Sequence, residues 1–544
     1  MWSAAGVTGE KVVQYGTQIA TVLVLAIQVA LIPLVLVRRK EASSTIAWIL
    51  TLIFIPLLGA FLFLLFGRDR VRMGASNKRR AKAASRERLQ GVVRNRRGGV
   101  VPIPRETSEG LETASSSELG RAQPTGEVNA DVALAFENVE LESRLDLLDP
   151  VDRPIFRVGG RLGHMAATTE NDVHVMSSAD DATVQMFAAI EQAQSSVHAE
   201  YYLVRDDATG REFRDRLIAA ALRGVRVRLL VDGFGGLALD ATYVDAFEKA
   251  GVEMARFLPI RALGAGLHAR LLGAFQWNLR NHRKILVVDG RVAFTGGVNI
   301  GDDVRSWRDT HVRIEGPAVH SLQAIFLEDW EFATGKPVAD VGDFPSFPPE
   351  ARISQRTSEM RARGIVEIVA SGPDTANEAI HRVFFAAITG ARERVFITTP
   401  YFVPDRALIV ALQTSALSGV DVRMIVPAKS NHRVTAAAGR SFYEECLEAG
   451  VGIYEYLPGM IHSKTIVVDG RIALVGSANM DMRSFRLNYE VHAVVRDATA
   501  ALRLERTFHE DLAQTRKLEL STWRARSLLA RVAEGAGRLV APLL

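Results

Sequence analysis

Two stretches of the 544-residue chain carry the same reactive side chains at matching spacing. One reads NHRKILVVDGRVAFTGGVNIGDD from Asn281, and the other reads IHSKTIVVDGRIALVGSANMDMR from Ile461. In each, a lysine follows the histidine by two residues, an aspartate by seven, a Gly-Gly or Gly-Ser pair by fourteen and an asparagine by seventeen, and an acid comes later. The first copy contains His282, Lys284, Asp289, Gly296, Gly297, Asn299 and Asp309, and the second contains His462, Lys464, Asp469, Gly476, Ser477, Asn479 and Glu490.

These residue types favour chemistry on an anionic phosphodiester. A protonated lysine offers no lone pair to a metal ion, so two His-Lys pairs make a poor metal site. Two lysines and two asparagines would instead stabilise negative charge, while one imidazole attacks phosphorus and the other protonates the leaving group. The single cysteine, Cys446, excludes an intramolecular disulfide and any multi-cysteine metal site. The sequence therefore predicts a site that needs no metal or cofactor.

The elements that position these residues can be predicted locally. A histidine and a lysine two apart on a strand lie on the same side of a sheet. Apolar runs on both sides of an Asp-Gly pair predict a hairpin with a tight turn. Asp289 and Asp469 therefore have two open interpretations, as catalytic residues grouped with the His-Lys pairs or as turn-forming residues.

The repeat extends well beyond the two stretches. LRGVRVRLLVD, from Leu222 to Asp232, corresponds to LSGVDVRMIVP, from Leu417 to Pro427. Short apolar strands alternate with amphipathic helices from about Pro150 onward, which predicts an α/β fold of two similar lobes, at residues 150–345 and 346–544. The last residues of the second lobe predict an amphipathic helix, which either lies on a membrane surface or packs on its own domain.

The N-terminal part differs in character from these lobes. Thr17 to Val37 and Ile46 to Phe66 each contain 21 residues without a charge, which is enough to cross a bilayer as a helix. We therefore predict two transmembrane helices in residues 1–67, followed by a basic and then Ser/Glu-rich linker over residues 68–149. Twelve basic residues against two acids between Arg68 and Arg97 predict cytoplasmic lobes, and they also suit anionic headgroups.

The two motifs are typical of the phospholipase D superfamily, whose signature they match. Further segments resemble bacterial cardiolipin synthases, including EYYLVRDDATG, WRDTHVRIEGPAV, TTPYFVPD and GSANMDMRSFRLNYE, as do the paired apolar stretches and the terminal APLL. The resemblance covers nearly the whole chain and is weakest from Gly98 to Ala130. It implies two tandem phospholipase D-like α/β/α lobes, related by pseudo-twofold symmetry, that place both motifs at one central cleft.

The same resemblance implies roles for the motif residues. His282 would be the nucleophile, forming a phosphohistidine, and His462 the general acid and later the base. Lys284, Lys464, Asn299 and Asn479 would bind phosphate, with Ser477 nearby. Asp309 and Glu490 match the acids that orient the histidines, and the sequence leaves open which acid serves which histidine.

The resemblance also implies the reaction. One phosphatidylglycerol would donate its phosphatidyl group to a second one, which releases glycerol and forms cardiolipin in a bacterial plasma membrane. A hydrolase or a nuclease of the same superfamily remains an alternative, whereas intact motifs in both copies argue against a non-enzymatic scaffold. The basic run lies beside the apolar stretches, so we expect phosphatidylglycerol, other anionic lipids and the membrane as partners, and no nucleic acid.

One departure between the lobes is an insertion. The first lobe has extra residues within LPIRALGAGLHARLLGAFQWNLR, from Leu258 to Arg280, just before its motif. This segment mixes large apolar residues with arginines and has no acid. It is interpreted either as a lobe-specific core loop or as an interfacial lip that delivers lipid to the site.

Overall fold

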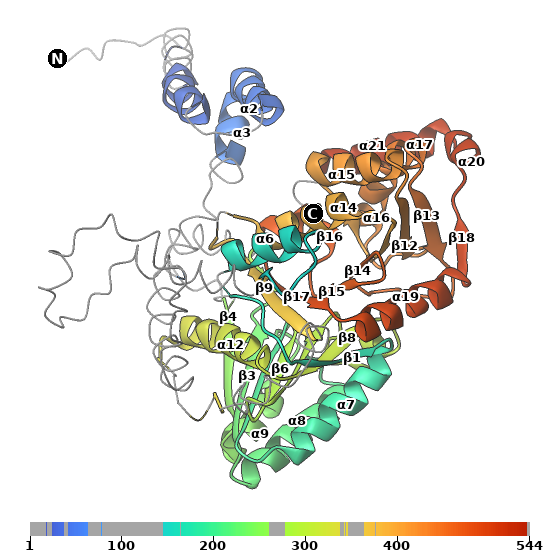
Figure 1. Cartoon of the computed structure of the whole chain (residues 1–544). Helices are drawn as coiled ribbons and strands as arrows, with labels where there is room; N and C mark the ends of the chain where they lie inside the picture. The colour runs from blue at the N-terminus through green and yellow to red at the C-terminus, as the bar shows by residue number, and fades with distance from the viewer. Residues whose placement is uncertain are drawn as a thin grey trace, which may run out of the picture. The chain divides into compact units, whose positions relative to one another are not determined.

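The computed structural model describes residues 18, 24–36, 42–63, 78, 145–163, 165–259, 278–337, 342, 344–345, 364–375 and 377–540. Most of the predicted insertion from Leu258 to Arg280 lies outside these residues. The chain divides into two units, Met1–Ser76 and Asn77–Leu544 (Figure 1).

The N-terminal unit contains a helix over residues 24–36 and two further helices, α2 (Ala42–Phe54) and α3 (Pro56–Leu62). Pro56 stands at the start of α3, where a missing amide hydrogen is tolerated, and the chain bends at Ile55 just before it. The Trp48 and Phe63 rings meet with centroids 5.4 Å apart. Large apolar residues such as Val29 and Phe54 nevertheless remain exposed on this unit.

The two predicted membrane spans, Thr17 to Val37 and Ile46 to Phe66, lie partly outside the described residues. Within the residues that are described, no helix combines the length and the apolar character that crossing a membrane requires.

The first lobe is built on a seven-stranded mixed sheet with the strand order β1-β8-β7-β6-β2-β3-β4. Leu229 and Leu230, which are adjacent on β3, lie in two different apolar cores, one on each face of the sheet. Helices α7, α8 and α9 cover one face, and α12 covers the other (Figure 1). The strands are β1 (Asp172–Met176), β2 (Ser196–Tyr201), β3 (Arg226–Asp232), β4 (Glu253–Phe257), β6 (Ile285–Val288), β7 (Val292–Gly296) and β8 (His311–Glu315), and the helices are α7 (Ala179–Gln192), α8 (Ala208–Leu222), α9 (Ala241–Ala250), α11 (Asp302–Arg305) and α12 (Val319–Thr334).

The second lobe repeats this topology. Its sheet runs β18-β13-β12-β10-β14-β15-β17, and β9 pairs with β17 as β1 pairs with β8. The predicted repeat is therefore present in the strand order. The strands are β9 (Ile365–Ser371), β10 (Arg394–Thr398), β12 (Asp421–Pro427), β13 (Gly452–Tyr456), β14 (Thr465–Val468), β15 (Ile472–Gly476), β17 (Asn488–Arg496) and β18 (Thr515–Lys517), with the short pair β11 (Phe402–Val403) and β16 (Met480–Asp481).

The helices of the second lobe include the predicted C-terminal amphipathic helix, α21 (Leu528–Val540). This helix packs on α16, because a Cβ at Gly537 would lie 2.7 Å from the backbone nitrogen of Ala438. Its outer face leaves Leu529 and Leu539 exposed. The other helices are α14 (Ala379–Gly390), α15 (Arg406–Leu417), α16 (Arg433–Arg440), α17 (Tyr443–Glu448), α18 (Met482–Arg486), α19 (Ala498–Leu512) and α20 (Leu520–Arg524).

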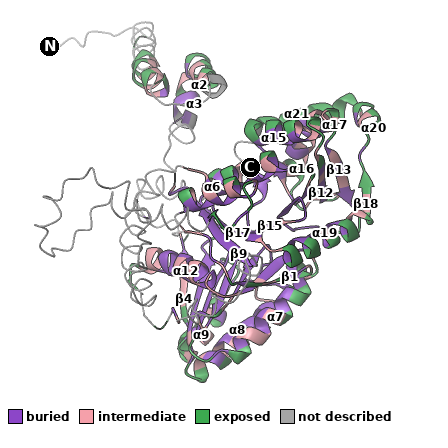
Figure 2. Ribbon diagram, in the orientation of Figure 1, coloured by how far each residue is buried: buried purple, intermediate pink, exposed green. Residues whose placement is uncertain are grey.

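The two lobes form one body with a shared core. The short strand β5 (Arg280–Asn281) of the first lobe pairs in parallel with β17, and Arg308 forms a bridge with Ile461. One buried apolar cluster contains Val287 and Val467, which come from the two lobes. The strands at this junction are buried, as the purple ribbons in Figure 2 show. Both motif histidines directly follow these inter-lobe pairings.

One helix departs from the predicted lobe boundary. Ile155 and Phe156 of α6 (Arg153–Gly163) pack in the core of the second lobe, beside Phe384. The sequence pattern predicts that residues from 150 onward belong to the first lobe. An amphipathic helix buries its apolar face wherever a sheet offers uncovered surface, and chain order alone does not say which sheet that is.

Candidate active site

The two motifs lie at equivalent edges of their sheets. In the first lobe Ile285 on β6 faces Glu200 near the carboxyl end of β2, and in the second lobe Thr465 on β14 faces Thr398 at the end of β10. Ligands of α/β proteins commonly bind at this edge. Each lysine turns back toward its own histidine: Lys284 Nζ donates to the His282 carbonyl at 2.6 Å, and Lys464 Nζ donates to that of His462.

Each histidine is paired with the acid of the other lobe. His282 Nδ1 lies 3.0 Å from Glu490 Oε2, and His462 Nδ1 lies 2.7 Å from Asp309 Oδ2. Both carboxylates are buried. The sequence leaves this pairing open, and the structure shows a crossed arrangement that joins the two motifs into one site.

The two histidines are neutral in the free protein. Burial lowers the pKa of His282 to about 4 and that of His462 to about 3, although the facing carboxylates oppose this effect. Burial acts to raise the pKa of Glu490, but its interactions with His282, the charge of Lys284 and the hydrogen bond from Ser477 outweigh it and lower that pKa to about 2. An ionised carboxylate needs a donor, so we assign the ring hydrogen to Nδ1 of each histidine. Each Nε2 then carries the lone pair.

Both lysines are easy to deprotonate. Burial lowers the pKa of Lys284 to about 7 and that of Lys464 to about 8, and Glu490 and Asp309 act in the opposite direction. The charges also reach across the lobes, since Lys464 contributes to the lowered pKa of His282 and Lys284 to that of His462. An incoming phosphate would favour the protonated forms of all four groups.

The asparagines and the serine next to the motifs have different surroundings. Asn299 Oδ1 accepts from the Leu203 amide at 3.2 Å, which leaves its amide hydrogens available to a ligand. Asn479 is buried, and its side-chain oxygen has no hydrogen-bond partner among the described residues. Ser477 Oγ donates to Glu490 Oε2 at 2.5 Å, so its hydroxyl hydrogen is directed at the acid. The prediction that Ser477 helps to bind phosphate stays a prediction, because this contact is with the acid.

The motif aspartates lie at the turns of their hairpins. Asp289 and Asp469 have positive φ angles of 55° and 50°. The carboxylate of Asp289 accepts from the amide of Ser195 at 2.7 Å, and that of Asp469 from the amide of Glu393 at 2.8 Å. These contacts tie each turn to the start of the neighbouring strand, at the opposite end of the hairpin from the histidine. They support the turn-forming interpretation and give no support to the grouping with the catalytic residues.

Aromatic rings and further histidines complete the site, and the sequence analysis does not single them out. The Tyr202 ring lies 5.1 Å from that of His282, and the Trp307 ring lies 4.9 Å from that of His462. His311 and His492 are buried two residues after each acid, where they contact the backbone nitrogens of Val298 and Ala478. The matching offset of these two histidines is a signal that the sequence contains.

A buried ionic network supports the first motif. Arg283, between His282 and Lys284, donates to one oxygen of Asp329, and Lys78 donates to the other. The ammonium group of Lys78 also lies 3.6 Å from the ring centroid of Tyr489, the neighbour of Glu490. Lys78 belongs to the predicted basic linker, yet it is buried. One residue of that basic run therefore contacts the core beneath the site and not solvent or lipid.

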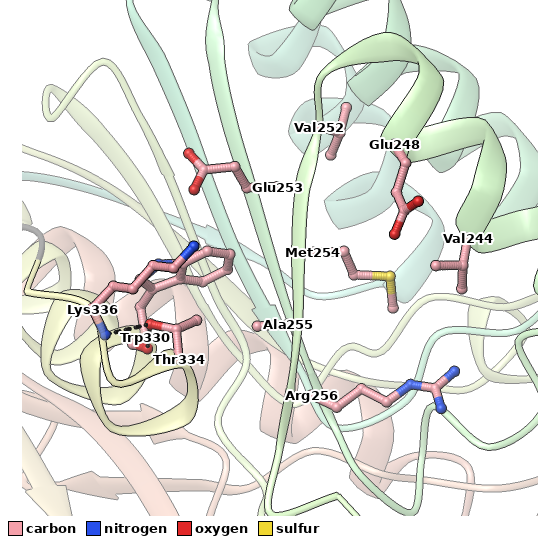
Figure 3. Close-up of a pocket in the computed structure, with 10 residues that line it drawn as sticks. All are labelled: Val244, Glu248, Val252, Glu253, Met254, Ala255, Arg256, Trp330, Thr334 and Lys336. Carbon is pink, nitrogen blue, oxygen red and sulfur yellow. Dashed lines mark hydrogen bonds between the residues drawn. The ribbon is translucent and has the colours of Figure 1, made fainter.

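One pocket among the described residues lies apart from the motifs. It has a volume of about 460 Å³ and lies at β4, the edge strand of the first sheet (Figure 3). Glu253 and Trp330 lie on one side of that strand, and Met254 and Val244 lie on the other. None of its lining residues belongs to either motif.

Comparisons with known proteins report which family models, relatives and solved structures the chain resembles. The PLD-like domain of cardiolipin synthases matches residues 186–330 and 384–512, and the N-terminal domain of the phospholipase D-nuclease family matches residues 24–68. The chain is 40% identical to a cardiolipin synthase from Geobacillus kaustophilus, over 73% of this chain and 77% of the relative. It is 34% identical to a cardiolipin synthase from Alkalihalophilus pseudofirmus, over 93% of this chain and 90% of the relative. Among solved structures, a phosphatidylserine synthase from Haemophilus influenzae resembles the fold with a TM-score of 0.53 and 15% identity, over 72% of this chain and all of that one.

Proposed function

Because the chain belongs to the cardiolipin synthases, which are phosphatidyltransferases of the phospholipase D superfamily, we propose that it works by a two-histidine mechanism. The observation that carries this proposal is the crossed pairing of His282 with Glu490 and of His462 with Asp309. Each pair leaves one Nε2 available, as a nucleophile and a proton carrier require.

In the first step, His282 Nε2 attacks the phosphorus of one phosphatidylglycerol. A P–N bond forms, the P–O bond to the headgroup glycerol breaks, and the glycerol oxygen takes a proton from His462. His462 carries this proton because the negative charge of the bound substrate raises the pKa of His462 from its low value in the empty site. Lys284, Lys464 and the amide of Asn299 stabilise the charge that develops on the phosphoryl oxygens.

In the second step, a hydroxyl of a second phosphatidylglycerol attacks the phosphorus. His462 Nε2, now neutral, takes the hydroxyl proton, the P–N bond breaks and the new P–O bond completes cardiolipin. Asp309 stabilises the imidazolium of His462 in both steps, and Glu490 does the same for the phosphorylated ring of His282. Burial of these groups favours a lipid hydroxyl over water as the acceptor.

We further propose that residues 1–67 anchor the enzyme in a bacterial plasma membrane as a two-helix hairpin with the lobes in the cytoplasm. The match of residues 24–68 to the phospholipase D-nuclease N-terminal domain supports this. So do the exposed apolar residues on α2 and the helix before it, because a soluble domain rarely leaves so many uncovered. Resistance of the full chain to carbonate extraction from membranes, and its loss after removal of residues 1–67, would test the proposal.

The reaction is tested by its products. Purified protein given phosphatidylglycerol vesicles should release glycerol and cardiolipin in equal amounts, measured by mass spectrometry. Phosphatidic acid as the main product would replace the synthase with a hydrolase that uses water as acceptor.

The roles of the two histidines are tested with a phosphatidyl ester of p-nitrophenol. This leaving group needs no proton, so His462→Ala should release one equivalent of nitrophenol in a burst and then stall as a phosphatidyl-His282 adduct. His282→Ala should give no burst. The opposite result would assign the attack to His462.

A further inference from the structure

Four large apolar side chains are exposed at the sheet edges that carry the site. Phe234 and Leu237 follow β3 in the first lobe, where they are 55% and 53% exposed. Val434 and Leu457 follow β12 and β13 in the second lobe, where they are 53% and 54% exposed. We call these four residues the apolar rim. Exposed apolar residues gathered around a functional site commonly mark an interaction surface.

In the first lobe, hydrogen bonds connect the apolar rim to the catalytic motif. Asp232, at the end of β3, accepts from the Phe234 amide at 2.8 Å with one oxygen and from the Asn281 amide at 2.8 Å with the other. Asn281 directly precedes His282. The same loop packs against Tyr202, because a Cβ on Gly235 would lie 1.7 Å from the Tyr202 carbonyl oxygen. The Asp232 carboxylate therefore links the backbone of Phe234 to Asn281, the residue before the proposed nucleophile His282.

In the second lobe, the apolar rim residues also follow strands of the sheet that carries the motif. Leu457 precedes His462 by five residues, and the Met460 carbonyl between them accepts from the Arg308 amide at 3.1 Å. Val434 lies in the first turn of α16, two residues after His432, whose ring is 5.5 Å from that of Tyr401. Both residues stand at the carboxyl ends of parallel strands, as Phe234 and Leu237 do.

Basic residues accompany the apolar rim in the second lobe. Lys429 and Arg433 flank the turn between β12 and α16, and both are exposed. Neither of them pairs with a carboxylate among the described residues. Exposed apolar side chains beside unpaired cations suit the acyl and headgroup layers of an anionic membrane.

We propose that the apolar rim inserts into the surface of an anionic phospholipid bilayer, with Lys429 and Arg433 on the headgroups. The site edge then faces the lipid, so that a phosphatidylglycerol headgroup passes from the membrane to the two histidines without crossing water. This inference rests on the proposed function, since only a lipid-modifying site gains from such contact.

The repeat supplies a matched control at the opposite edge of each sheet. Leu222 ends α8 and Leu417 ends α15, at corresponding positions just before β3 and β12, and they are 75% and 74% exposed. They are as apolar and as exposed as the apolar rim, but they lie away from the site. A general effect of surface leucines would appear equally in both sets.

The first experiment separates bilayer substrate from dissolved substrate. Full-length Phe234→Ser/Leu237→Ser should turn over phosphatidylglycerol in bilayers at least about tenfold more slowly, since burial of one large apolar side chain contributes about that factor. Turnover of monomeric dihexanoyl-phosphatidylglycerol and the melting temperature should stay unchanged, as should all three measurements in Leu222→Ser/Leu417→Ser. Unchanged turnover on bilayers, or an equal loss on both substrates, would overturn the proposal. Product formation from the dissolved lipid tests the proposed function separately.

The second experiment locates the side chains directly. The native Cys446 is buried, so single cysteines at 234, 237, 434 and 457 can carry an environment-sensitive dye in reconstituted protein. Brominated lipids in vesicles that contain phosphatidylglycerol should quench these four dyes and spare dyes at 222 and 417. If the emission of these dyes shifts with protein concentration and bromine does not quench it, a second copy of the chain covers the apolar rim. That result would overturn the proposal.

Discussion

The two lobes hold the same His-Lys pair by different means. In the first lobe the residue between the pair is Arg283, which forms a buried ionic network with Asp329 and Lys78. In the second lobe that residue is Ser463, whose hydroxyl lies 2.9 Å from Thr310 Oγ1 and 3.0 Å from Arg308 Nη1. The first motif is therefore supported by charges and the second mainly by hydroxyl groups.

The acids differ as well. Asp309 fits beside Gly297, where a Cβ would lie only 2.1 Å from its Oδ1. Glu490 instead accepts from Ser477, which occupies the position corresponding to Gly297, and from Asn488 Nδ2 at 3.1 Å. The duplication has preserved the groups that react and has changed the groups that hold them. Two chemically similar motifs can therefore take unequal roles, and the comparison can be tested at each difference.

The largest expected effect comes from the two acids. Asp309→Asn and Glu490→Gln should each lower kcat about 10³-fold, because an amide no longer stabilises the imidazolium or selects its tautomer. The phosphatidyl ester of p-nitrophenol distinguishes the roles of the two acids. Asp309→Asn should keep most of its nitrophenol burst and Glu490→Gln should lose it, whereas equal bursts would mean that the two lobes share the attack.

The support of the first motif is tested at Lys78. Lys78→Met should cost about 3–5 kcal/mol of unfolding free energy, since it leaves Asp329 with one buried partner fewer. Lys336→Met is the control, because that lysine is exposed and its loss should cost almost nothing. Ser463→Ala, at the corresponding support of the second motif, should cost about 1 kcal/mol. Chemical denaturation in detergent measures all three, and equal costs for Lys78 and Lys336 would contradict the burial of Lys78.

The neighbours of the acids should respond unequally. Gly297→Ala pushes a methyl group into Asp309 and should lower kcat about 10²-fold by displacing it from His462. Ser477→Ala removes one donor from Glu490 and should lower kcat by about tenfold, which corresponds to one hydrogen bond to a charged group. If Gly297→Ala is as active as the wild type, the close fit of Asp309 is wrong.

The last expected effect is a pH dependence that also differs between the lobes. Burial lowers the pKa of Lys284 to about 7 and that of Lys464 to about 8, so their cationic forms are present below these values and are lost as the pH rises through them. The kcat/KM for phosphatidylglycerol should therefore fall above about pH 7, by up to about tenfold per unit. Lys284→Arg should remove the decline near pH 7 and leave the one near pH 8, because arginine stays charged. A flat profile up to pH 9 would contradict both lowered pKa values.

Much of the local structure near the site was predictable. The apolar run before Asp289 predicts a strand followed by a tight turn, and β6 and its turn agree with it, because backbone geometry ties neighbouring residues together. The prediction that His282 and Lys284 lie on this strand is wrong, since both residues precede β6. The repeated order of strands is likewise visible in the sequence. The sequence alone could not decide between the two interpretations of Asp289 and Asp469. The decision depends on hydrogen bonds from the amides of distant residues such as Ser195 and Glu393.

Contacts between distant segments were not predictable in the same way. In the sequence, Lys78 is one of twelve basic residues of the predicted linker, yet in the structure it lies beside Tyr489 in the core. Ile155 is predicted to belong to the first lobe, yet it packs in the core of the second. No local pattern distinguishes these residues from neighbours of the same type, because their burial depends on which surface the rest of the chain leaves uncovered.

The sequence by itself determined the reactive groups, their number and their duplication, because residue type and short-range spacing decide what chemistry a strand can present. Only the tertiary structure decided how those groups combine. The pairings of His282 with Glu490 and of His462 with Asp309 join residues more than 150 positions apart. They exist because β5 of one lobe pairs with β17 of the other, which brings two equivalent sheet edges together.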